Sequence, residues 1–62
     1  MKTTRLDYEF RDYYDIIGIS GTEEGVCIYK NGKFIGQVAW TSCAEIDEMT
    51  DDEFDEWLYE NL

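Results

Sequence analysis

Carboxylates are the only densely grouped side chains with chemical potential in this 62-residue chain. From Glu45 to Leu62 there are nine acids and no base, whereas residues 1–44 hold five bases and six acids. Paired carboxylates can act as catalytic acid and base when a dry pocket raises the pKa of one of them. A chain this short can hardly enclose a substrate such as a sugar, so we expect a solvated acidic surface instead.

Other catalytic and metal-binding patterns are missing from the sequence. It contains no His, so a nucleophilic Ser, Cys or Thr would need a lysine as its base. The acids between Glu45 and Glu56 lack the glycine and the spacing of an EF-hand calcium loop. Cys27 and Cys43 do not have the spacing of a zinc site. We expect no enzymatic activity, no cofactor and no specific metal site.

The overall charge restricts the partners of the chain. Fifteen acids against five bases give a net charge of −10 at pH 7, which disfavours direct binding to nucleic acid. No segment has the roughly 18 apolar residues of a membrane span, and the first residues form no signal peptide. We therefore expect a cytoplasmic protein without membrane contact. In that compartment both cysteines are interpreted as small buried side chains, with a disulfide as the alternative.

A β-hairpin is predicted over residues 25–40, where Asn31-Gly32 joins two apolar-rich runs. Asn and Gly suit the two positive-φ positions of a type I′ turn, whose twist matches paired strands. A two-residue loop then sets the register as follows: Lys30 opposite Lys33, Tyr29 opposite Phe34, Ile28 opposite Ile35, and Cys27 opposite Gly36.

Residues 3–11 alternate in polarity and predict a half-buried strand. A helix could also be drawn through this region, but Thr, Tyr and Asp are weak helix formers, which favours the strand. Residues 12–15 would then turn the chain into a second, apolar strand over residues 15–20. The loop 21–25, with a glycine at each end, is short enough to make the third strand antiparallel to the second.

Two capping boxes predict helical structure near the C-terminus. Ser42 precedes Glu45 by three residues and can start a short helical turn, and Thr50 stands in the same relation to Glu53. Phe54, Trp57 and Leu58 follow at the spacing of one helical face. The second segment is therefore an amphipathic helix that packs its ring-bearing face on the sheet.

These elements predict a single α+β domain over residues 1–62: a small antiparallel β-meander of three or four strands with a C-terminal amphipathic helix packed on one face. The expected strands cover about 3–11, 15–20, 25–30 and 33–40, and the helical region covers about 43–61. The expected core residues are Leu6, Tyr8, Phe10, Ile17, Ile19, Ile28, Ile35, Val38, Trp40, Phe54, Trp57 and Leu58. One helix leaves the second sheet face open, so we expect it to be covered by a partner or, as a homodimer, by a second copy.

The acidic helix face is the candidate binding surface. If the helical phase continues through Thr50, several acids and Tyr59 gather opposite the ring-bearing stripe, where an aromatic residue has no packing role. The predicted protein-binding residues are Glu48, Asp52, Asp55, Glu56 and Tyr59, with Asp51 and Glu60 at the rim. The competing site is the outer face of the hairpin around Lys30 and Lys33.

In size, acidity and lack of catalytic groups, the chain resembles the small inhibitors that phages direct against host defence systems, including DNA mimics and anti-CRISPR proteins. The seven acids between residues 48 and 60 give one charge per roughly 2.6 Å of helix, against one per ~1.7 Å in B-DNA. The resemblance implies stoichiometric binding to a protein with a basic surface. The alternative is an antitoxin-like or structural accessory domain of a mobile element, whose acidity serves only solubility.

Overall fold

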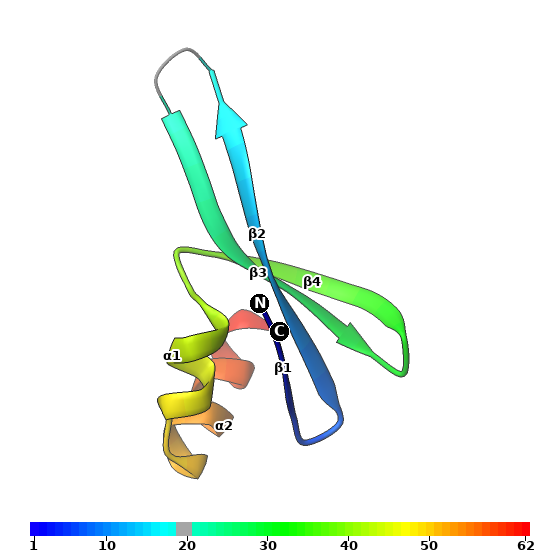
Figure 1. Cartoon of the computed structure of the whole chain (residues 1–62). Helices are drawn as coiled ribbons and strands as arrows, with labels where there is room; N and C mark the ends of the chain where they lie inside the picture. The colour runs from blue at the N-terminus through cyan, green and yellow to red at the C-terminus, as the bar shows by residue number, and fades with distance from the viewer. Residues whose placement is uncertain (19–20) are drawn as a thin grey trace.

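The computed structural model describes residues 1–18 and 21–62 and consists of an antiparallel sheet with a C-terminal helix pair packed against it (Figure 1). The strands are β1 (Lys2–Arg5), β2 (Tyr8–Ile17), β3 (Gly21–Lys30) and β4 (Lys33–Ala39), and neighbours in sequence are neighbours in the sheet. The helices are α1 (Cys43–Glu48) and α2 (Asp51–Asn61). The predicted α+β meander is thereby confirmed in its four-stranded form.

The N-terminal boundaries differ from the prediction. The expected strand 3–11 is two strands, β1 and β2, joined by a turn at Leu6-Asp7. Leu6 has a φ of 54°, a backbone conformation that sequence rules do not expect of leucine. The expected turn at residues 12–15 is absent because β2 continues through these residues. The tyrosines there suit a strand, and they pair with β3. Residues 15–17 of the expected strand 15–20 therefore belong to the end of β2, Gly18 lies in a turn, and residues 19 and 20 lie outside the described residues.

The Asn31-Gly32 turn is confirmed, with φ values of 53° and 77°. Lys30 pairs with Lys33 and Tyr29 with Phe34, as predicted. Beyond them the predicted register is wrong, because a β-bulge gives β4 one extra residue, Ile35. The observed partners are Ile28 with Gly36 and Cys27 with Gln37.

The bulge places Gly36 beneath the end of α2. A Cβ atom built on Gly36 would lie 3.3 Å from Cδ2 of Leu62, so the missing side chain leaves room for the C-terminal residue. Ile35 is displaced from the core as a result and is 40% exposed. The shift in register thus serves the packing of the helix on the sheet.

Among the residues whose side chains the structure describes, six apolar ones form the buried core. They come equally from the sheet and from the helical region: Phe10, Val26, Ile28, Cys43, Ile46 and Phe54. Phe10, Ile28 and Phe54 were predicted to be buried, and Tyr8, Val38, Trp57 and Leu58 pack partly buried against them. The core is therefore built around α1 as much as around α2.

Three predicted core residues are wrong, because each lies where the chain turns or bulges. Leu6 and Trp40 have positive φ values in turns and are 71% and 68% exposed. Ile35 lies at the bulge. The expected burial of Ile17 and Ile19 falls outside the part of the chain whose side chains the structure describes.

An aromatic cluster joins the sheet to α2. The ring of Phe10 lies edge-on to Phe54 and to Trp57, with 5.9 Å between ring centroids in each pair. Such tilted arrangements are favoured because the positive edge of one ring meets the negative face of the next. The ring-bearing stripe of α2 therefore packs on the sheet, as its spacing predicted.

The β2–β3 hairpin extends beyond the body of the protein (Figure 1). β1 pairs only with Tyr8–Arg11, and β4 pairs only with Gly25–Lys30, so the rest of β2 and β3 forms a two-stranded arm. The chain leaving β4 passes beside the base of this arm before it enters α1. This arrangement brings residues from three separate segments together.

Candidate protein-binding surface and adjacent cleft

The two helices do not form one continuous helix. α1 ends at Glu48, and Met49 has extended backbone angles (φ −64°, ψ 141°). α2 then begins at Asp51 with its own N-cap, Thr50. The Thr50 hydroxyl accepts from the Glu53 N–H, and the Glu53 carboxylate accepts from the Thr50 N–H. The assumed phase through Thr50 is therefore wrong, and Glu48 does not belong to the face of α2.

The remaining predicted residues do share α2. Asp52 lies three and four residues before Asp55 and Glu56, and these two lie four and three residues before Tyr59, which places all four on one stripe. All are exposed, as are Asp51 and Glu60 beside them, and we call these six residues the α2 face. Tyr59 is 89% exposed, the largest exposed fraction among the large apolar side chains described.

Folding makes little use of the α2 face. Within residues 1–18 and 21–62, only Asp51 of this face takes part in an ion pair, at 3.1 Å from Nη2 of Arg5. Glu53 is occupied with its own capping box and lies outside the face. The other carboxylates of the face are free to meet an outside partner.

The basic residues of the sheet are placed differently. Arg11 and Lys2 both pair with Glu9, at 2.6 and 3.4 Å, and the Arg11 guanidinium also covers the Tyr29 ring. Burial alone would raise the pKa of Glu9, but the bonds and charges of these two bases bring it below its ordinary value. Lys30, from the competing hairpin site, lies 5.2 Å from the centroid of the Tyr8 ring. Arg11, Lys2 and Lys30 thus interact with side chains of the sheet itself.

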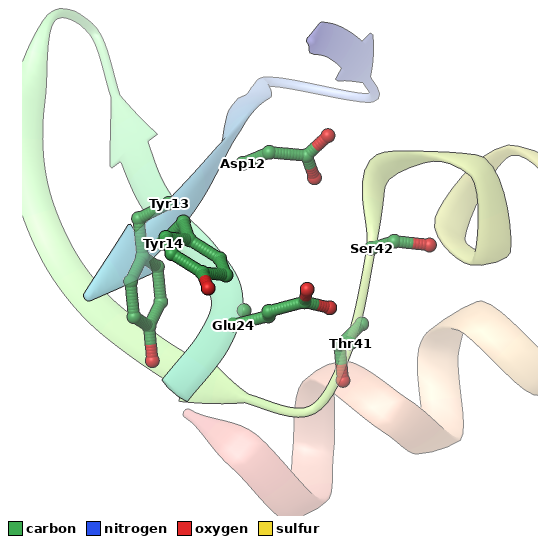
Figure 2. A pocket seen from close by; sticks show the side chains of 7 residues that line it. Asp12, Tyr13, Tyr14, Glu24, Thr41 and Ser42 are labelled. Carbon is green, nitrogen blue, oxygen red and sulfur yellow. The ribbon is translucent and has the colours of Figure 1, made fainter. Parts of the chain in front are cut away.

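A cleft of about 310 Å³ lies at the base of the arm, beside the connection from β4 to α1 (Figure 2). Its lining residues are Asp12, Tyr13, Tyr14, Glu24, Gly25, Thr41 and Ser42. Figure 2 shows the side chains of Asp12, Tyr14 and Glu24 directed toward the connection. The cleft therefore offers two carboxylates and tyrosine rings to a single small group.

Backbone contacts fix both walls of this cleft. The N–H of Trp40, which has a φ of 63°, donates to the carbonyl oxygen of Glu24 at 2.6 Å. The N–H of Cys43 donates to Asp12 at 2.9 Å, and the N-terminal ammonium lies 3.6 Å from the same carboxylate. The bond from Cys43 is the main reason that the pKa of Asp12 lies below its usual value, so this wall stays negative at neutral pH.

Sequence reasoning did not find the cleft. Ser42 was recognised as a helix cap, and its hydroxyl does accept from the Glu45 N–H. No sequence pattern pointed to Asp12, Tyr14 or Glu24. Their side chains come together only through the β2–β3 register and the path of the chain after Trp40. Only Glu24 lying opposite Tyr14 could have been deduced, once that register was known.

No known protein family, curated protein or solved structure matches the chain. Among the residues described, no helix is long and apolar enough to cross a membrane. Within the same ranges, no three His, Cys, Asp or Glu side chains are grouped so as to hold a metal ion.

Proposed function

We propose that this protein acts by stoichiometric binding to another protein that presents a basic surface, with the α2 face as its contact. The observation that carries the proposal is the exposure of Tyr59 among carboxylates of which, within the described residues, only Asp51 forms an ion pair. A tyrosine gains from burial in an interface and loses few rotamers there, and aromatic residues are common anchors of binding energy. The surrounding acids would attract a basic partner at long range and fix its orientation.

The target class that fits best is a nucleic-acid-handling or defence complex, whose basic surfaces such an inhibitor would occupy. α2 spans about 16 Å, and its face carries five acids, or one per about 3 Å. This is roughly half the charge density of B-DNA. The proposed contact therefore depends on general charge complementarity and on an aromatic anchor. The acids of α2 do not need to reproduce the spacing of DNA phosphates.

The experiment captures a partner from a lysate of the native host cells on immobilised protein and compares variants. Asp52→Lys combined with Glu56→Lys reverses two charges on the α2 face, and Tyr59→Ala removes the anchor. The matched control reverses two exposed acids elsewhere, Asp7→Lys with Glu45→Lys, so that net charge changes equally. We expect the control to retain the same protein at a similar affinity, and both α2 variants to lose it by tenfold or more.

Three results would contradict the proposal. Equal loss in the control variant would mean that only net charge matters. Loss in a Lys30→Glu, Lys33→Glu variant, with full binding by the α2 variants, would move the site to the hairpin. No protein retained even at low salt would favour the accessory-domain alternative, in which the acids serve solubility alone.

A further inference from the structure

The cleft at the base of the β2–β3 arm has a chemistry of its own that the α2 face does not share. Asp12 and Glu24 contribute carboxylates from neighbouring strands, and Tyr14 contributes a ring that is 61% exposed. Thr41 and Ser42 form the opposite wall (Figure 2). At about 310 Å³ the space matches the smallest of small-molecule sites, so it suits one side chain or a ligand of that size.

We infer that this cleft is a binding site for a guanidinium group. The two carboxylates exclude a phosphate or another anion and favour a cation. The guanidinium is planar, stacks on an aromatic ring, and donates from a fork that matches a carboxylate, so Tyr14 and Glu24 can act on it together.

An ammonium group fits less well. It is a compact and strongly hydrated point charge, which gains little from a ring wall and cannot form two parallel bonds with one carboxylate. Asp12 is already engaged in the fold, because its Oδ1 accepts from the Cys43 N–H and its Oδ2 lies 3.6 Å from the N-terminal ammonium, which offsets its charge. Glu24 is therefore the carboxylate that binds the ligand.

The proposal stands apart from the function assigned to the α2 face. The cleft is lined by residues 12–14, 24–25 and 41–42, and none of them belongs to α2. Loss of one activity would therefore leave the other intact.

The test is a titration of isotope-labelled full-length protein followed by amide chemical shifts in NMR. The probes are agmatine, N-acetylarginine amide, the neutral isostere N-acetylcitrulline amide, and N-acetyllysine amide. We expect saturable shifts confined to residues 12–14, 24–25 and 41–42 with a guanidinium probe. Citrulline should give none, and lysine should bind at least fivefold more weakly. Binding of both guanidinium probes indicates an arginine side chain of a protein as the natural ligand, whereas binding of agmatine alone indicates a free small molecule.

Variants distinguish specific binding in the cleft from a general attraction of cations to acidic residues. Glu24→Gln should weaken binding about tenfold, since a charge-assisted bond is roughly twice as strong as a neutral one. Tyr14→Ala should also weaken it, and the charge-matched control Glu48→Gln should leave it unchanged. Unaltered amide dispersion in each variant establishes that it is folded. Four results would each overturn the inference. They are equal shifts with the citrulline probe, equal affinity for the lysine probe, strongest shifts on α2, and undiminished binding by folded Glu24→Gln.

Discussion

The guanidinium carbon of Arg5 lies 4.5 Å from the centroid of the Phe54 ring, so an edge strand reaches the junction of the two helices. Its Nη1 donates to the carbonyl oxygen of Ile46 in α1 at 2.6 Å, and its Nη2 lies 3.1 Å from Asp51 in α2. The Arg5 side chain is only 18% exposed. This one residue therefore fastens β1 to both helices across the break at Met49.

Arg5→Ala should lower the free energy of unfolding by about 1.5 to 3 kcal/mol, because it removes a charged hydrogen bond and a cation–π contact from a shielded site. Asp51→Asn should cost much less, since the Asp51 side chain is fully exposed and water screens the pair. Urea denaturation of both variants measures the difference. Equal losses would mean that the surface ion pair, and not the contact with Ile46 and Phe54, stabilises the junction.

Phe54→Ala should cost about 3 to 5 kcal/mol, because the ring is 1% exposed and contacts Phe10 within the core. Chains of this size have total stabilities of about 3 to 9 kcal/mol, so the variant should be largely unfolded or close to it. The matched control is Trp40→Ala, which removes a 68% exposed ring and should cost less than about 1 kcal/mol. Circular dichroism melts distinguish them, and a near-native melting temperature for Phe54→Ala would contradict this core.

Leu6→Gly should stabilise the protein by about 0.5 to 1.5 kcal/mol, since a leucine at positive φ is strained and glycine is not. Little burial is lost, because Leu6 is 71% exposed. The adjacent Asp7 has no positive φ, so Asp7→Gly should destabilise by a similar amount through its added backbone freedom. Chemical denaturation of both variants gives the comparison, and destabilisation by Leu6→Gly would place the turn elsewhere.

Gly25→Ala should destabilise the protein by about 1 to 3 kcal/mol through overpacking. A Cβ there would lie 2.2 Å from the carbonyl oxygen of Val38 and 2.7 Å from Cε1 of Tyr13, so paired backbone would have to move. Gly36→Ala is the matched control, because its new Cβ would meet only the flexible end of Leu62 at 3.3 Å. Comparable melting temperatures for the two variants would contradict the close β3–β4 approach at Gly25.

Stability should fall in alkaline solution because of Cys43. Burial raises the pKa of this thiol from 9.0 to about 11. The unfolded chain releases the proton first, so the contribution is complete below about pH 9 and is lost as pH rises toward 11. Denaturation of the wild type and of Cys43→Ala between pH 7 and 11 isolates it. The slope with pH should be shallower in the variant, and identical slopes would mean that the thiol is not buried.

Local interactions explain what the sequence determined by itself. The Asn31-Gly32 turn, the Thr50 capping box and the stripe of Phe54, Trp57 and Leu58 each depend on residues within four positions of one another. Exposure of the acids of α2 follows from the same periodicity, so most of the candidate binding face could be predicted. Glu48 could not, because the extended backbone at Met49 ends the helical phase that was extrapolated to it.

Contacts between distant segments decided the rest. Leu6 turns because Arg5 and Tyr8 pair across it, and Ile35 bulges outward where Gly36 makes room for Leu62. Cys43 was expected to be buried, and it is, but its place in the core depends on α1, where its N–H donates to Asp12 of β2. The cleft likewise exists only where the arm meets the connection after Trp40. These features depend on how separate elements pack into one small core, and local sequence patterns do not contain that information.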